Sequence, residues 1–161
     1  MIHPEILIGD LLSQLNKVTF YHYGNEDELK KVMSIKRELY PMVWYVMPYQ
    51  KGSQKTDTKV WKGNVKLLLA TNNKAQPTND VRNNTTFKDT LNPLYDDVIN
   101  AFVKNPNFTI VDNKVDDIKL FNYYKKDVGS RDKPQKRIVN DIWDVIVLEF
   151  NLIINNNFCQ T

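Results

Sequence analysis

The sequence predicts a single α+β domain: an antiparallel or mixed β-sheet, flanked by two or three helices, that ends in a long C-terminal strand. The main observation is residues 137–155, the longest β-favouring segment, rich in Val, Ile, Trp and Phe and free of Gly and Pro. Separate segments carry apolar residues at helical spacing instead. The length of 161 residues is that of one domain, and no linker divides residues 1–161.

Alternation along the C-terminal segment defines two faces of a strand. One face is apolar and is interrupted only by Asp144; it comprises Ile142, Ile146, Leu148, Phe150, Leu152 and Ile154. The other face is apolar at one end and polar at the other; it comprises Trp143, Val145, Val147, Glu149, Asn151 and Ile153. This pattern predicts a central strand whose second face is covered by either a second buried layer or another subunit.

Helical spacing of apolar residues predicts helices over residues 4–16, 26–38 and 93–104. Asn25 and Glu28 form a capping pair at the start of the second helix. For the third, the apolar spacing runs through residues 81–102 with Pro93 inside it. Either the helix kinks there or Asn92 caps a new helix with Pro93 at its first position, and we favour the restart.

Shorter strands are predicted over residues 17–23, 41–48, 63–70, 108–111 and 117–124, with Val60–Trp61 pairing locally. Polar stretches at residues 50–59, 71–79 and 125–136 are predicted to be exposed connections.

The composition is typical of a globular protein without membrane spans. Hydrophobic residues make up 42% and charged residues 25%, the net charge is +3, and the mean hydropathy is −0.50. The apolar runs are far shorter than the roughly 20 residues of a membrane helix, and the N-terminus lacks the pattern of a signal peptide. The single cysteine, Cys159, forms no internal disulfide and is interpreted as a bystander thiol.

Signatures of catalysis are absent from the sequence, which contains no dinucleotide, P-loop, zinc-protease or nucleophile-elbow motif. Two histidines and one cysteine are too few for a structural zinc site. We interpret His22 as a strand residue, and Asp112, Asp116 and Asp117 as a solvated loop, because they lack the spacing of a calcium loop. The sequence therefore predicts a non-enzymatic protein with no cofactor and no metal.

The most basic stretch is residues 125–137, with six positive and two negative side chains. Its cations are Lys125, Lys126, Arg131, Lys133, Lys136 and Arg137. The stretch is either a soluble hairpin tip or a contact with nucleic-acid phosphates or an acidic partner. The second alternative would make the chain a nucleic-acid-binding module.

Surplus apolar surface is the more informative feature of the sequence. Large aromatic residues are spread over several predicted strands, and a cluster of them on one face would mark a protein–protein interface. The candidate subunit interface comprises Trp44, Trp61, Trp143, Val145 and Val147.

Three local sequences resemble small neck or tail proteins of tailed bacteriophages, including the crAss-like phages of Bacteroidetes. These are Tyr40-Pro-Met-Val-Trp-Tyr-Val-Met-Pro48, Leu91-Asn-Pro-Leu-Tyr-Asp-Asp97 and the segment at residues 140–159, in which Asp-x-Trp-Asp opens the last strand and Cys159 lies near the end. The order of elements is similar to that of head-completion and tail-terminator proteins.

The resemblance implies a tail-terminator-like structural protein of the virion, assembled in the host bacterial cytoplasm, at the head–tail junction or the tail end. It implies a ring of identical subunits around the DNA channel, joined to other neck, portal or tail proteins. Non-specific contact with DNA in the channel is a further expectation. No catalytic residues carry over from the resemblance, and no membrane contact is expected.

Overall fold

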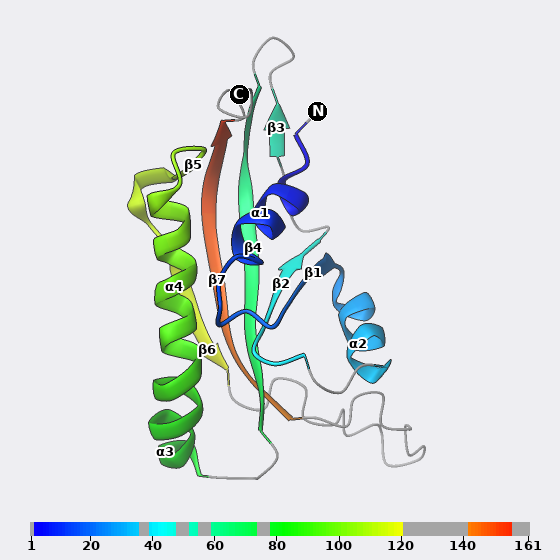
Figure 1. The fold of residues 1–161 in the computed structure, drawn as a ribbon, viewed down its shortest axis with the longest axis vertical. Coiled ribbons are helices and arrows are strands. Elements are labelled where there is room, and N and C mark those ends of the chain that lie inside the picture. The colour runs from blue at the N-terminus through cyan, green and yellow to red at the C-terminus, as the bar shows by residue number, and fades with distance from the viewer. Residues whose placement is uncertain are drawn as a thin grey trace.

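A computed structural model describes residues 2–35, 39–47, 52–54, 59–73, 78–120 and 142–155. Its helices are α1 (Pro4–Leu12), α2 (Glu26–Ile35), α3 (Asn79–Arg82), the π-helix η1 (Asn83–Leu91), α4 (Asn92–Lys104) and the 3₁₀ turn η2 (Val111–Asn113). Its strands are β1 (Phe20–Gly24), β2 (Met42–Val46), β3 (Gly52–Gln54), β4 (Val60–Asn73), β5 (Phe108–Ile110), β6 (Asp116–Leu120) and β7 (Ile142–Asn155). The α+β prediction, with its long C-terminal strand, is confirmed (Figure 1).

The described strands form one seven-stranded mixed sheet: five follow the order β1-β2-β4-β7-β5, β3 pairs with β4, and β6 pairs with β7. Among the strands that the structure describes, β1 and β2 pair in parallel and the other pairs are antiparallel. β7 is paired with β4 along all 14 of its residues, and β5 and β6 pair with its other side. The predicted central position of the C-terminal strand is therefore confirmed.

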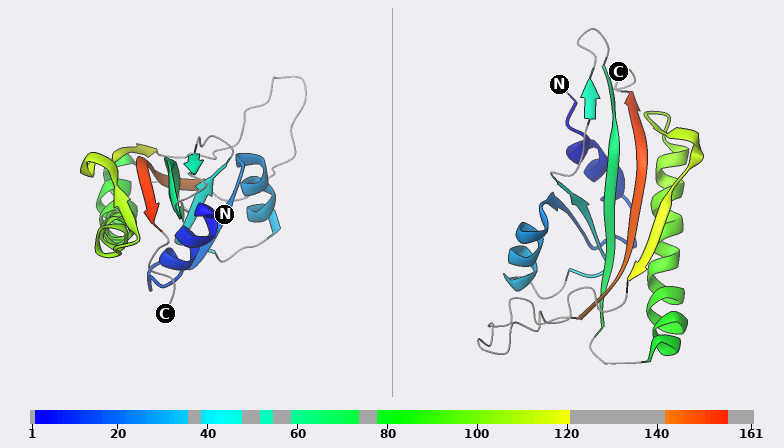
Figure 2. Two further views of the ribbon diagram at one scale, coloured as in Figure 1. Left: turned by 90° about the horizontal axis from the view of Figure 1, so that it is seen from above. Right: turned by 180° about the vertical axis from the view of Figure 1, so that it is seen from behind.

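The first face of the sheet is covered by α1 and by the helix that runs from α3 to α4 (Figures 1 and 2). Side chains from both helices meet those of β2, β4 and β7 in the larger core cluster. Phe102 of α4 joins the layers, because its ring lies 5.5 Å from that of Phe108 and 5.2 Å from that of Phe150, both edge-on.

The second face of the sheet changes from apolar to polar along the length of β4 and β7. At one end, β2, β4 and β7 bury a second apolar cluster beneath Leu29 of α2: Met42, Trp44, Val46, Leu68, Ala70, Trp143, Val145 and Val147. Toward the other end the cross-strand pairs become polar, with Lys66 opposite Glu149 and Asn64 opposite Asn151. The predicted alternation of β7 is thus confirmed.

The predicted helix restart at Asn92 is wrong. Asn92 has helical dihedral angles, and helix continues from Asn79 to Lys104 through the π-helical segment η1. The backbone N–H of Asn92 donates to the carbonyl oxygen of Phe87, five residues back, as π-helical geometry requires. Because η1 buries Phe87 and Leu91 against the sheet, tertiary packing keeps the chain helical at the position where capping rules predicted a new start.

Other boundaries also differ from the prediction. β4 begins at Val60 and extends to Asn73, well beyond the predicted strand 63–70, because β7 pairs with it throughout. Gly52–Gln54, in a predicted loop, form β3 beside β4. α1 ends at Leu12 instead of residue 16.

Two tyrosines, the half-buried Tyr21 and the buried Tyr45, lie beneath α1. The hydroxyl of Tyr21 donates to the carbonyl oxygen of Glu5 at 2.7 Å, and Gly9 allows the close approach, since a Cβ there would lie 2.5 Å from the Tyr21 ring. Tyr45 is fully buried, and its hydroxyl has no hydrogen-bond partner within the described residues. Burial raises the pKa of Tyr21, as do the neighbouring Tyr45 and Glu5; burial and Glu5 likewise raise the pKa of Tyr45.

Removing each of these two hydroxyls is expected to change the stability of the protein in opposite directions. Tyr45→Phe removes an unsatisfied buried hydroxyl and is expected to raise the free energy of unfolding by about 1 kcal/mol, whereas Tyr21→Phe loses a hydrogen bond and lowers it by about 1 kcal/mol. Urea unfolding at pH 7 measures both. A Tyr45→Phe protein less stable than the wild type would contradict the prediction.

The same tyrosines predict a loss of stability in alkali. The folded-state pKa values of both tyrosines lie above the unfolded value of about 10. Their contribution to the free energy of unfolding is therefore complete below about pH 10 and falls as the pH rises further. Urea unfolding between pH 8 and pH 11 is expected to show a shallower decline for Tyr45→Phe than for the wild type. Parallel declines would contradict this.

Candidate functional site

The residues predicted as a subunit interface are buried within the single chain. Trp44, Trp143, Val145 and Val147 come together in the second core cluster, with exposed fractions of 0 to 8%. Trp61 lies on the opposite face, in the larger cluster. The five residues therefore do not form one surface, and the four on the second face form a buried layer that the chain itself supplies.

The basic stretch at residues 125–137, with Lys125, Lys126, Arg131, Lys133, Lys136 and Arg137, lies outside the described residues. Its contact with phosphates or an acidic partner stays a prediction.

A buried ion pair lies beneath the start of the long helix. Arg82 and Asp144 are 3% and 0% exposed, and the guanidinium Nη1 lies 3.9 Å from the carboxylate Oδ1. Asp144 is the residue that interrupts the apolar row of β7, and this interruption was the only sequence signal for the pair. Since one buried charge without the other would be costly, the pair joins the helix to the sheet at a defined position.

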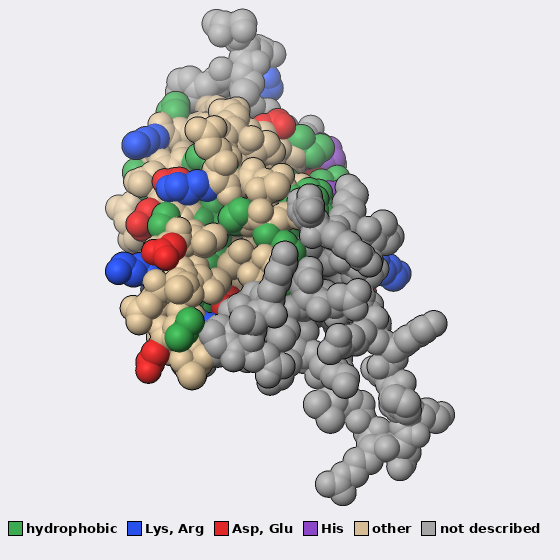
Figure 3. All heavy atoms as spheres, turned by 60° about the horizontal axis from the view of Figure 1, so that its bottom comes forward, with side chains coloured by type: hydrophobic (Ala, Val, Ile, Leu, Met, Phe, Trp, Pro, Cys, Tyr) green, Lys and Arg blue, Asp and Glu red, His purple; other side chains and the backbone are tan. Residues whose placement is uncertain are grey.

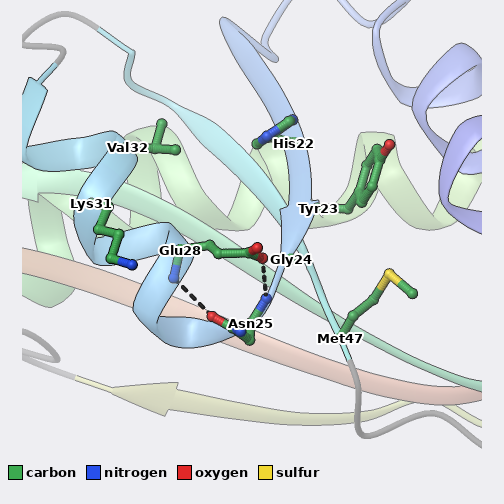
Figure 4. A pocket seen from close by; sticks show the side chains of 8 residues that line it. All are labelled: His22, Tyr23, Gly24, Asn25, Glu28, Lys31, Val32 and Met47. Carbon is green, nitrogen blue, oxygen red and sulfur yellow. Dashed lines mark hydrogen bonds between the residues drawn. The ribbon is translucent and has the colours of Figure 1, made fainter.

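A hollow of about 620 Å³ lies between the end of β1 and α2. It is lined by His22, Tyr23, Gly24, Asn25, Glu28, Lys31, Val32 and Met47. Figure 4 shows His22 and Tyr23 leaving β1 on opposite sides, with Lys31 and Val32 on α2 across the hollow. The hollow therefore wraps around the outermost strand of the sheet.

Local hydrogen bonds hold the start of α2, which forms one side of the hollow. The backbone N–H of Glu28 donates to Oδ1 of Asn25 at 2.8 Å, and the N–H of Asn25 donates to Oε2 of Glu28 at 2.9 Å. This is the capping pair that the sequence predicted. Gly24, with φ of +149°, turns the chain from β1 into the helix, and its carbonyl oxygen accepts from Nε1 of Trp44 at 3.0 Å.

The opposite end of the sheet presents a different surface. β6 is exposed over its first four residues, and the side chain of Ile118 is 60% exposed. Asp116 precedes it on the same side of the strand and pairs with Lys114 at 3.4 Å, with both groups in solvent. On the other side, Nζ of Lys119 lies 5.7 Å from the centre of the Phe87 ring.

The remaining described surface carries mixed charge. Figure 3 shows Lys and Arg side chains interspersed with Asp and Glu on the visible face. Within the described ranges, no three His, Cys, Asp or Glu side chains come together as metal ligands would. None of the helices in the described part of the chain is both long and apolar enough to cross a membrane.

A comparison with protein-family models finds no family that matches the chain, and a comparison with curated proteins finds no match.

Substitution of Val145 distinguishes a buried layer from a subunit contact. Because Val145 is 0% exposed, Val145→Lys is expected to lower the free energy of unfolding by about 3–5 kcal/mol, the cost of an uncompensated buried charge. Val103→Lys, at a position 66% exposed on α4, is the control and should change it by less than about 0.5 kcal/mol. Thermal unfolding measures both. A Val145→Lys protein that stays folded and loses only self-association would place Val145 at an interface.

Proposed function

We propose that the chain is a non-enzymatic structural protein of a tailed-phage virion. In this proposal its copies join edge to edge into a ring at the head–tail junction or the tail end, around the channel for DNA. The ring would contact neighbouring neck, portal or tail proteins. The resemblance of its local sequences to small phage neck proteins supports this proposal, and the α+β architecture is compatible with it.

The observation that carries the proposal is that the sheet ends in two unlike edges. β1 lies at one end and β5 and β6 lie at the other. Each end presents a large exposed apolar side chain, Tyr23 at 39% and Ile118 at 60%. An edge strand leaves backbone donors and acceptors available for another chain, and exposed apolar groups add contact area.

Unlike edges favour a particular kind of assembly. When one edge of a subunit contacts the opposite edge of the next, the interface is heterologous, and a rotation that closes gives a ring. An isologous dimer would instead need one edge to be complementary to itself. Two different edges on opposite sides of the sheet therefore support a ring over a two-fold dimer.

Electron microscopy and light scattering of the purified protein test the proposed function. We expect closed rings with cyclic symmetry, whose abundance increases with protein concentration. A protein that remains a single monomeric species at high concentration would contradict self-assembly. The gene provides an independent readout, because a virion protein of this kind is expected beside portal, capsid and tail-tube genes.

A further inference from the structure

We propose that the buried Arg82–Asp144 pair holds η1 in its π-helical register, and that without the pair the segment rewinds into an α-helix that turns Arg82 away from the sheet. The start of the long helix is then an element with two registers, and one buried charge pair selects between them. The inference is independent of the proposed ring, because it concerns contacts within a single chain.

The spacing of the buried residues distinguishes the two registers. Residues three or four apart share a face of an α-helix, and this spacing relates Phe87 to Leu91 and Leu91 to Leu94. Arg82 and Phe87 are five residues apart, yet both are buried, at 3% and 1% exposed. Because the hydrogen bonds of a π-helix join residues five apart, its wider turn brings these two side chains to the same face.

An α-helical register would bury a different residue. Counting back from Leu91 at α-helical spacing gives Phe87 and then Asn84, which is exposed in the structure. Arg82 would point away from this face, and the carboxylate of Asp144, which is 0% exposed, would lose the Arg82 guanidinium. Separating the partners of a buried ion pair is strongly destabilising. The pair therefore favours the π register, although α-helical hydrogen bonding is the usual form.

Pro93 accounts for the other end of η1. Its ring carries no N–H and, in an α-helix, clashes with the carbonyl oxygen four residues back, here that of Asp89. The wider turn before it, in which the N–H of Asn92 donates to the carbonyl oxygen of Phe87, avoids this clash. That constraint ends within the turn before Pro93 and does not extend to Arg82. The nine residues of η1, longer than the single turn of most π-helical segments, thus need both causes.

The two registers differ in the segment before Phe87. Phe87 and Leu91 are four residues apart, which is close to one turn of either helix, so rewinding leaves both against the sheet. The part that turns is the beginning of η1 together with α3, at the end of the long helix (Figure 1). It carries Val81, which is 47% exposed. The change of register therefore alters the surface at this end of the molecule and keeps the core.

Cysteine reactivity measures the register. Asn84→Cys is made in a Cys159→Ser background, with and without Asp144→Leu, which removes the carboxylate that holds Arg82. We expect Asp144→Leu to slow the reaction of the Asn84→Cys thiol with Ellman's reagent by about 10-fold, because this side chain turns toward the sheet. Asp89→Cys, exposed on the outer side of the helix, should react equally fast in both backgrounds. An unchanged Asn84→Cys rate in a folded Asp144→Leu protein overturns the proposal.

Deletion of Asn84 gives a second measurement and leaves both charges in place. Without Asn84, Arg82 lies four residues before Phe87, so an α-helix places both on one face and keeps the pair with Asp144. We expect the thermal midpoint of this variant to lie within about 3 °C of the wild-type value.

Deletion of Asn100, an exposed asparagine of α4, is the matched control. It removes one residue between the buried Val98 and Phe102, whose spacing is already that of an α-helix, and should lower the midpoint by more than about 10 °C. A loss on deletion of Asn84 as large as that on deletion of Asn100 overturns the proposal, because η1 would then hold no residue beyond what an α-helix needs.

Discussion

The fold depends on the antiparallel pairing of β4 with β7, which runs through all 14 residues of each strand. This ladder supplies the interior of both core clusters, because alternate residues of the two strands face opposite sides of the sheet. The helices on the first face and α2 on the second pack on this pair, and among the described strands β5 and β6 pair with β7 alone. Disturbing the register of the pair by one residue would exchange its apolar and polar faces.

The same ladder explains why the molecule has two unlike edges. β7 pairs with two short strands on its outer side, β5 and β6, joined by a turn in which Asp112 and Asn113 adopt positive φ. On the other side of β4, β2 and β1 continue the sheet, and the chain leaves β1 directly into α2. One edge is therefore a charged strand that projects Ile118, and the other is an aromatic strand beside a hollow. A head-to-tail assembly requires this kind of difference.

Polar contacts between the layers fix how the helices sit on the sheet. The Arg82–Asp144 pair holds the start of the long helix at one end of β7, and the Tyr21 hydroxyl holds α1 through the carbonyl oxygen of Glu5. Apolar packing alone tolerates sliding between layers, whereas a buried charge pair or hydrogen bond is satisfied in one arrangement. These contacts thus define the relative placement of layers whose outer edges are proposed to bind neighbouring copies.

Local periodicity and local hydrogen bonding were enough to predict the class of fold, the alternation of β7, its central position and the capping pair at Asn25 and Glu28. The continuous helix through Pro93, the full length of β4 and the positions of the tryptophans depend on contacts between distant segments. Pairing with β7 extends β4 past its apolar residues, and packing of Phe87 and Leu91 keeps η1 helical. The number of aromatic residues likewise does not tell core residues from interface residues. Trp44 and Trp143 are buried among Leu29 and the neighbouring strands. The exposed Ile118, in contrast, lies on the mostly charged strand β6. Burial depends on which segments meet across the sheet, and that information is not local in the sequence.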